Sequence, residues 1–499
     1  MKSKINILMA LLISQVSVAN LSGKLDTTFS NDGTTDGWLL YDTNDINHTF
    51  RSHDVVVDSL GRVIVVGNFS VQHNPNLGIE YQTRLKRYLK NGQLDTSFGN
   101  NGVVDFILTS SSYNEEKINK LALTPHDAIF IGSSRLKCIS EFESECHFDV
   151  KINFVNSHGV KAGKIDIPFD YASTPIRKRD VFKDLVYVAT SNPEIGKVAI
   201  TAEVSRELSS DTDFGIAVIK ADLVTGELFM DTSFHFDGKT ECHFNQTDGS
   251  RNQDSPTSIS WNKQGNTYIV AGTIYEGVYP DNYGQNMGFC EFSQGGTLLR
   301  QWSTKNNNTF DVKSFESAND IQIGEDSEGA VSLYVTGTMD GATDGDLTLM
   351  RYQQTIFGEW FIDTSFGANL TGISTAGFSL PFIGDTSDVP SELHIEKDGS
   401  ILVFGRGTWN DPTLKSALIF AKFKQNGELD TSWGIGQAGK VILPLATSAA
   451  YYDFASGLTE DPKTQEIYVV GYTKDSVNNR YLGFVVNMHN DVIFKNNFE

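Results

Sequence analysis

The sequence predicts an all-β fold, a seven-bladed β-propeller of four-stranded antiparallel blades that is closed by an N-terminal strand. A short phrase that recurs at intervals of about 67 residues indicates the repeat. An alternating hairpin between copies of the phrase indicates that each unit is a small antiparallel sheet. The two chain ends carry complementary partial units, which favours a closed ring over an open stack.

The repeated phrase is an apolar residue, then Asp-Thr, then Ser or Thr, then an aromatic residue. Its five copies are LDTTF at 25–29, LDTSFG at 94–99, MDTSF at 230–234, IDTSFG at 362–367 and LDTSWG at 429–434. The gaps between their aspartates are 69, 136, 132 and 67 residues, so each long gap spans two units. Degenerate turns at 166–169 and 295–298 fill the long gaps, which gives seven units. Because the phrase recurs, we interpret its polar residues as turn caps and its aromatic residue as an anchor between blades.

Each unit also contains a hairpin of two strands around a turn with Asp, Gly or Pro. These hairpins lie at 55–67, 117–132, 185–204, 259–272, 321–337, 393–405 and 458–471, and the third is the least regular. One strand follows the phrase, as at 103–108, and another precedes the next unit, as at 148–155. Each unit therefore has four short strands, and almost no helix is expected after residue 20.

The chain ends predict how the ring closes. The segment GWLLY at 37–41 is a spare strand before the first hairpin, and the last unit ends at strand 481–488 without an outer strand. Placing 37–41 beside 481–488 completes the last blade and removes two exposed edges. The alternative is that 37–41 forms the edge of its own first blade, beside 82–89.

The order of phrase, strand, hairpin and strand resembles the bacterial delta-60 repeat over nearly all of residues 24–490. The match is best at 94–99, 55–67 and 393–405, and the third and fourth units depart from the pattern. The resemblance implies a propeller-like, exported bacterial protein. It supplies no catalytic residues that could be carried over to this sequence.

The first 19 residues have the pattern of a signal peptide, and residues 20–499 are expected to form a single propeller domain. Lys2 and Lys4 precede an apolar stretch at 5–13, and Ser17-Val18-Ala19 offers small residues for cleavage. A buried first helix is the alternative. We expect an exported protein, periplasmic, at the cell surface or extracellular, and a monomer.

The net charge of −22 argues against nucleic acid as a partner, since nucleic acid needs a basic face. It argues against anionic lipid as well. No later stretch approaches the roughly 20 apolar residues of a membrane-spanning helix. The expected partner is therefore an unidentified protein or glycan.

Four cysteines in an exported chain are expected to be paired. We predict a Cys138–Cys146 disulfide, because the two residues lie between strands of one hairpin, and a less specific Cys242–Cys290 pair between two blades. No cofactor is predicted, but Asp340, Asp344 and Asp346 in MDGATDGD could ligate calcium. Asp211 and Asp213 occupy a similar loop, which favours a turn over a metal there.

The sequence contains no HExxH, GxSxG or CxxC motif, and every strong motif recurs in several units. We therefore predict a binding or scaffold protein without an identifiable catalytic site. The alternative is an extracellular hydrolase or lyase that acts on a polysaccharide or peptide at the central channel. The convergence of three or more ionisable groups from different units in a closed pocket would favour the enzyme.

Overall fold

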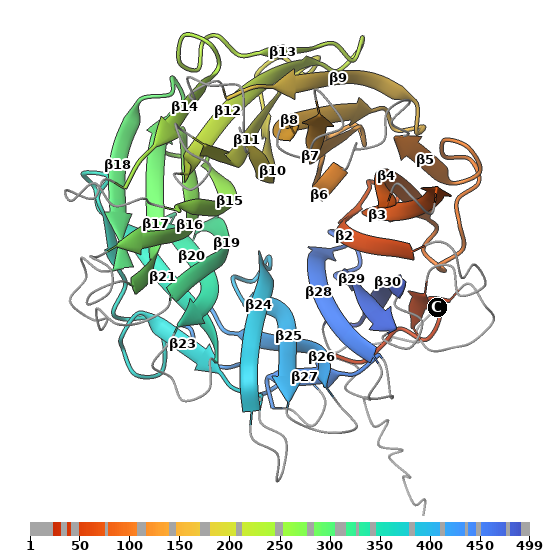
Figure 1. Ribbon diagram of the computed structural model, residues 1–499. Helices are drawn as coiled ribbons and strands as arrows, with labels where there is room; N and C mark the ends of the chain where they lie inside the picture. The colour runs from red at the N-terminus through yellow and green to blue at the C-terminus, as the bar shows by residue number, and fades with distance from the viewer. Residues whose placement is uncertain are drawn as a thin grey trace, which may run out of the picture.

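The computed structural model describes residues 23–30, 37–40, 49–74, 78–106, 116–138, 146–169, 180–205, 212–244, 253–276, 284–304, 316–325, 329–339, 346–378, 385–409, 415–434, 438–445, 451–475 and 480–490. These residues form seven antiparallel sheets and no α-helix. The sheets are arranged as blades around a ring, with the first strand of each blade nearest the centre (Figure 1). The chain is thus a seven-bladed β-propeller, as predicted.

The strands of each blade follow one another in sequence, except in the last blade. Blade 1 consists of β2 (Thr49–Val57), β3 (Val63–Asn74), β4 (Gly78–Tyr88) and β5 (Val103–Phe106). Blade 2 consists of β6 (Glu116–Leu123), β7 (Ile129–Cys138), β8 (Cys146–Val155) and β9 (Lys161–Ile167). Blade 3 consists of β10 (Val181–Ala189), β11 (Ile195–Ser205), β12 (Thr212–Asp222), β13 (Leu228–Met230) and β14 (Lys239–Cys242). Blade 4 consists of β15 (Ser255–Asn262), β16 (Thr267–Glu276), β17 (Gly284–Ser293) and β18 (Leu298–Ser303).

The remaining three blades complete the ring. Blade 5 consists of β19 (Glu316–Glu325), β20 (Val331–Met339), β21 (Leu347–Gln354), β22 (Trp360–Ile362) and β23 (Ile373–Ala376). Blade 6 consists of β24 (Asp385–Ile395), β25 (Ile401–Trp409), β26 (Ser416–Phe423) and β27 (Lys440–Leu443). Blade 7 consists of β28 (Tyr451–Glu460), β29 (Ile467–Asp475), β30 (Arg480–Met488) and β1 (Trp38–Leu40). All seven predicted hairpins are the two inner strands of a blade.

The N-terminal segment closes the ring. Trp38 of β1 is the register partner of Val486 in β30, and Leu40 that of Phe484. Just before β1, the Asp26 N–H donates to the Asn487 carbonyl at 2.9 Å. The predicted closure is therefore confirmed, and the alternative pairing with 82–89 is wrong because β5 occupies that edge of β4.

The core lies between the blades. Middle strands such as β26 are buried on both faces, because each blade packs against two neighbours. The aromatic residue of the phrase belongs to these interfaces: Phe98 packs with residues of blades 1 and 2, and Phe366 with residues of blades 5 and 6. The five phrase aromatics are Phe29, Phe98, Phe234, Phe366 and Trp433, and each is at most 2 % exposed.

The aspartate of the phrase caps the turn that follows it. Asp95 Oδ1 accepts hydrogen bonds from the N–H and the hydroxyl of Ser97 at 3.1 and 2.6 Å, and the other four copies make the same pair of bonds. Asp95 Oδ2 accepts from Arg87 Nε at 2.8 Å. Burial alone would raise the pKa of Asp95, but the bonds from Ser97 and the charge of Arg87 outweigh it and lower that pKa. The phrase is therefore structural, as predicted.

Candidate binding site in the central channel

The innermost strands of all seven blades contain a β-bulge or similar irregularity at a corresponding place. The register of each inner strand shifts there relative to its partner, as between Ser52 and Asp54 in β2. A bulge re-aims the neighbouring side chains. The residues that directly follow the shifts are Asp54, Lys120, Asp184, Ser258, Asp320, Glu392 and Gly457. We call these seven residues the channel ring.

The channel ring surrounds a cavity at the centre of the propeller. This cavity has a volume of about 420 Å³, and every ring residue except Gly457 lines it. The next residue along each strand is apolar in all seven blades, for example Val55 after Asp54 and Leu393 after Glu392. Alternation along the strand thus places a polar side chain on the channel and an apolar one toward the core.

The ring carboxylates connect neighbouring inner strands. Asp54 accepts the N–H of Val55 in its own blade at 2.9 Å and that of Leu121 in the next blade at 2.7 Å. Asp184 and Asp320 each bind two backbone N–H groups in the same way. Glu392 accepts the N–H of Leu458 in blade 7 at 2.6 Å. Four of the seven junctions between inner strands are therefore bridged by a carboxylate.

Asp184, Ser258 and Asp320 form a proton-deficient triplet. Ser258 Oγ lies 3.0 Å from Asp184 Oδ2 and 2.8 Å from Asp320 Oδ1, but a hydroxyl has only one proton to donate. If the hydroxyl donates to one carboxylate, its oxygen faces the oxygen of the other carboxylate without a proton between them. These two oxygens repel each other unless one carboxyl group is protonated. Burial, together with the charge of Asp320, raises the pKa of Asp184 from 3.8 to about 6, and burial also raises the pKa of Asp320.

Lys120 is the one basic residue of the channel ring. Its ammonium contacts Glu392 of blade 6, so this ion pair spans the channel from blade 2. It also lies 4.0 Å from Asp54 Oδ1. Burial would lower the pKa of Lys120, but the charges of Asp54, Asp184 and Asp320 outweigh it and raise that pKa. Lys120 therefore stays charged among four acids.

Polar residues extend the site along the channel. His394, two residues after Glu392, lines the same cavity, and its Nε2 lies 2.8 Å from Glu460 Oε2. Gln322, two residues after Asp320, donates to the Leu393 carbonyl at 2.6 Å. These residues continue the polar lining of the channel beyond the ring.

An enzyme is expected to bring three or more ionisable groups from different units together in a closed pocket, and that number of groups is reached. Six ionisable residues from five blades line one cavity, and burial raises the carboxyl pKa values of three of them, Asp54, Asp184 and Asp320. The cavity is open to solvent, however, and both oxygens of Asp54, Asp184 and Asp320 are held by backbone donors. A carboxylate fixed in this way is suited to bind a charge more than to transfer a proton.

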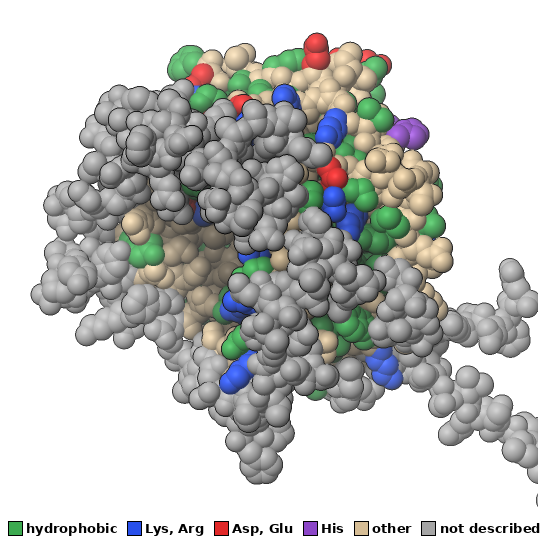
Figure 2. Space-filling model, turned by 45° about the vertical axis from the view of Figure 1, so that its right-hand side comes forward, with side chains coloured by type: hydrophobic (Ala, Val, Ile, Leu, Met, Phe, Trp, Pro, Cys, Tyr) green, Lys and Arg blue, Asp and Glu red, His purple; other side chains and the backbone are tan. Residues whose placement is uncertain are grey.

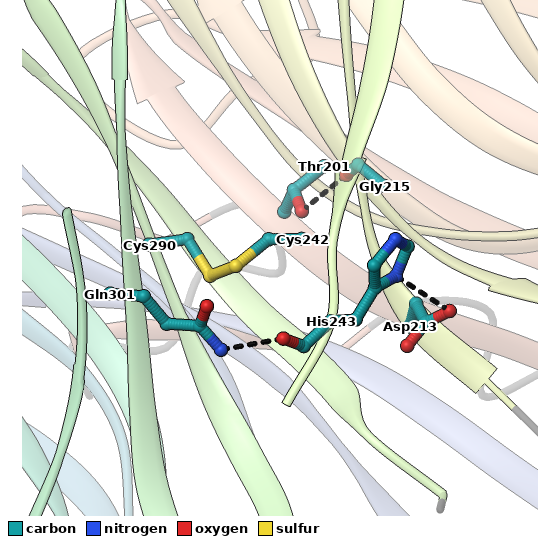
Figure 3. The surroundings of a disulfide bond; sticks show 7 residues. All are labelled: Thr201, Asp213, Gly215, Cys242, His243, Cys290 and Gln301. Atoms are coloured by element: carbon teal, nitrogen blue, oxygen red, sulfur yellow. Dashed lines mark hydrogen bonds and ion pairs between the residues drawn. A yellow bond between two sulfur atoms is a disulfide. The ribbon is translucent and has the colours of Figure 1, made fainter. Parts of the chain in front are cut away.

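The predicted disulfide between two blades is present. Cys242 at the end of β14 is bonded to Cys290 in β17, with a Cα–Cα distance of 6.5 Å (Figure 3). Gln301 of β18 donates to the backbone carbonyl of His243 at 2.6 Å, beside this bridge. Cys138 and Cys146 are register partners in β7 and β8, but their side chains lie outside the described ones, so this second bridge stays a prediction.

The acidic candidates of the sequence have different outcomes. Asp340 and Asp344 lie outside the described residues, and Asp346 alone is placed, just before β21, so the calcium site stays a prediction. Asp213 lies on β12 and not in a turn, with its Oδ2 3.0 Å from His243 Nδ1 (Figure 3). Glu241 Oε1 lies 3.2 Å from His243 Nε2. The sequence did not indicate this cluster, because its members meet only through the pairing of β12 with β14.

A family model agrees with the fold. The model of a beta-propeller domain of unknown function, DUF5122, matches residues 61–98, from the first hairpin of blade 1 to its phrase. No curated protein matches this chain significantly. Among the solved structures, a protein of unknown function from Dyadobacter fermentans is 9% identical, with 91% of this chain and 100% of that chain covered and a TM-score of 0.42.

Two of the similar structures are enzymes. An alpha-L-arabinanase from Penicillium chrysogenum is 9% identical, with 75% of this chain and 93% of that chain covered and a TM-score of 0.40. The polysaccharide lyase Uly1 is 11% identical, with 95% of this chain and 97% of that chain covered and a TM-score of 0.43. At these levels of similarity, neither activity is transferred to this chain.

Proposed function

We propose that this protein is an exported binding or scaffold protein, and that the channel ring binds a positively charged group of its ligand, such as a lysine or arginine side chain of a partner. The main observation behind this proposal is that four blades place a carboxylate at equivalent positions around one cavity, whereas only one blade places a lysine there. Such a cavity focuses negative potential on its mouth and attracts cations.

The charge of the whole chain supports a basic partner. The net charge is −22, so a basic segment is attracted over a longer range than the ring itself provides. The described lysine and arginine side chains on the face in Figure 2 are scattered among polar and apolar ones. Charge complementarity of this kind raises association rates and selects partners.

The proposal also includes that the protein is exported and that its units are delta-60 repeats. The Cys242–Cys290 disulfide is typical of an oxidising compartment, which supports export. No helix in the described part of the chain is long and apolar enough to cross a membrane. We assign the units to the delta-60 repeat because of the phrase and hairpin order, with the DUF5122 match over 61–98 as support.

The experiment is a peptide array followed by titration calorimetry on the mature protein. Peptides that contain lysine are compared with the same peptides acetylated on lysine, which removes the charge. We expect binding that weakens with salt and with acetylation, and that falls at least about tenfold in Asp320→Asn. The matched control is Asp105→Asn, which removes an acid paired with Arg84 on the outer strands. Equal binding of the acetylated peptides, or no loss in Asp320→Asn, would refute the proposal.

A hydrolase or lyase that acts at the channel is the second candidate. One observation favours it: the carboxyl of Asp184 has its pKa raised to about 6, which suits a general acid near neutral pH. Its test is depolymerisation of a panel of polysaccharides and peptides by the wild type and by Asp184→Asn. Activity that disappears in the variant would support the enzyme over the binding protein, and inactivity on the whole panel would count against it.

A further inference from the structure

In other blades the aspartate of the phrase is paired with basic side chains. Where the ring closes, the corresponding aspartate has no such partner among the described residues. We call residues 23–30, β1, Glu466 and the segment from Val486 to Asn490 the closure seam. Asp26 of the seam corresponds to Asp95 of blade 1, since the N–H of each donates to the third strand of its blade, to Asn487 and Arg87 respectively. Both carboxylates also cap the same turn, through Thr28 and Ser97.

In blade 1 the aspartate of the phrase faces two cations. Arg87 Nε lies 2.8 Å and Arg62 Nη1 lies 3.5 Å from Asp95 Oδ2. The same arrangement recurs elsewhere with other basic residues: Arg351 pairs with Asp363, and Asp231 contacts two lysines. In three of the five copies, the carboxylate in this position is thus neutralised by basic side chains of its own blade.

At the closure seam both cations are replaced. Asn487 occupies the position of Arg87, as the carbonyl that receives the N–H of the phrase aspartate shows. Glu466 occupies the position of Arg62, since each backbone carbonyl accepts the N–H of the aspartate that directly follows the inner strand, Asp461 and Asp58 respectively. Two positive charges have therefore become an amide and a second carboxylate.

The side chains at the seam provide metal ligands. Ligand atoms of Asp26, Glu466 and His489 all lie within 4.8 Å of one another. Asp26 is 8 % exposed and Asn487 is fully buried. The Asn487 amide nitrogen lies 3.3 Å from Asp26 Oδ2, and its buried Oδ1 has no hydrogen-bond partner. Rotation of this amide by half a turn would place the oxygen beside Asp26, in the same cluster.

The cluster lacks a compensating positive charge within the described part of the chain. No lysine or arginine there pairs with Asp26 or Glu466, and His489 Nε2 lies 4.0 Å from Asp26 Oδ1. Asp26 is buried, while Glu466 is half-buried and its Oε2 accepts from the Tyr468 hydroxyl at 3.3 Å. A buried carboxylate such as that of Asp26 is costly unless it is paired or binds a metal. The Nδ1 atom of His489 is also buried without a hydrogen-bond partner.

We propose that a divalent transition-metal cation of the Zn²⁺ type binds between Asp26, Glu466, His489 and the amide oxygen of Asn487, and fastens the N-terminal segment to the last blade. Two carboxylates and an imidazole are ligands that Zn²⁺ and its neighbours prefer, while Ca²⁺ favours sites with oxygen ligands alone. The cation replaces the two arginines of blade 1. It bridges segments that lie at opposite ends of the sequence.

A second cluster has similar ligands, so metal binding there has to be distinguished from metal binding at the closure seam. Asp213 and Glu241 each face one nitrogen of the His243 ring, at 3.0 and 3.2 Å. Binding to this cluster would not affect the closure seam, because it lies between β12 and the end of β14 in blade 3. All measurements are therefore made in a His243→Gln background.

The first test measures Zn²⁺ binding to the chelator-treated mature protein by titration calorimetry, with Ca²⁺ as comparison. We expect one Zn²⁺ per chain in His243→Gln and a loss of affinity of at least about tenfold after the further change His489→Gln. His489→Gln removes only a 4.0 Å contact, and circular dichroism checks that it folds. Undiminished binding after both His489→Gln and Glu466→Gln, or tighter binding of Ca²⁺ than of Zn²⁺, would overturn the proposal.

The second test asks whether the cation holds the seam. Hydrogen exchange of the peptides that contain β1 and β30 should slow at least about tenfold when Zn²⁺ is added, while exchange in blade 1 stays unchanged. Asn487→Arg restores the cation of blade 1, so it should protect the seam without Zn²⁺ and abolish the response. Zn²⁺ that binds without protecting these peptides would refute the role in closure. This result does not depend on the ligand of the channel ring.

Discussion

The proton balance of the channel ring can be tested at Asp184. In Asp184→Asn the residue no longer titrates and its charge no longer acts on Asp320, so the difference in stability between wild type and variant reports the protonation of these two facing carboxyl groups. The amide keeps one oxygen as an acceptor and loses one of the two backbone bonds, from Leu185 or Ile259. That loss does not depend on pH, so it shifts the difference by a constant and leaves its slope unchanged.

The size of the effect follows from the raised pKa. The pKa of Asp184 rises from 3.8 to about 6, mainly because of burial. At 1.36 kcal/mol per pKa unit, this shift corresponds to about 3 kcal/mol as an upper limit. Because the carboxyl keeps some contact with solvent, we expect about 1–3 kcal/mol. The folded state holds the proton more tightly, so this stability is complete below pH 4 and is lost as the pH rises through 6.

The assay is urea unfolding of the wild type and each variant at several values between about pH 2.5 and pH 7.5. Relative to Asp184→Asn, the wild type should lose about 1–3 kcal/mol over this range. Asp95→Asn supplies a control with the opposite sign, because the pKa of Asp95 is lowered in the folded state. There, the advantage of the wild type should be present above pH 4 and shrink as the pH falls below it. A difference for Asp184 that is flat, or that grows with pH, would refute the proton-deficient triplet.

Three further expectations concern stability and cross-linking. Non-reducing peptide mapping should find Cys138 joined to Cys146, since they are register partners; free thiols at both would contradict this. Cys242→Ser should lower the free energy of unfolding by about 2–4 kcal/mol, measured by urea unfolding without reductant; an unchanged value would count against the bridge between blades 3 and 4. Phe98→Ala should cost about 3–5 kcal/mol because the ring is fully buried, whereas Phe236→Ala, at a residue 92 % exposed, should cost under about 0.5 kcal/mol; similar losses for both would contradict the anchor role.

The fold could be predicted because its determinants are local and repeated. The cap formed by Asp95 and Ser97 spans three residues, so it leaves the same letters in every unit that uses it. The hairpins are visible through alternation, since both inner strands bury one face against a neighbouring blade. Closure by 37–41 followed from counting strands at the two ends and needed no contact information.

The channel ring was less visible, because its geometry repeats but its residues do not. An acid followed by an apolar residue occurs at the start of the predicted hairpin as Asp54-Val55, Asp184-Leu185 and Asp320-Ile321. Alignment of the hairpins on this pair would have revealed it. The bulge hides the signal, since it adds a residue to each inner strand and breaks the alternation there.

The clusters that depend on ring closure or strand register could not be predicted at all. Glu466 and Asn487 indicate a metal site only because they replace Arg62 and Arg87 of blade 1. That equivalence is visible only in the structure of the two blades. His243 follows a cysteine in the sequence, and nothing there indicates that Asp213 lies beside it. The spacing of residues along the sequence can predict contacts within one unit, but it cannot predict which residues of different units lie together.

The two sets of acids show how a repeat can separate structure from function. The phrase aspartates keep their identity in five copies, and their turn caps and, in three of the copies, basic partners stabilise the charged form. The channel ring keeps its geometry in seven copies while its residues vary between acid, base, serine and glycine. Lys120 is the only lysine of the channel ring and is paired across the channel with Glu392. The Asp184–Ser258–Asp320 side therefore has no direct ion pair with a basic residue of the ring. The proposed cationic ligand would therefore be attracted to one side of the channel, and a propeller of nearly equivalent blades would obtain a site with a single orientation.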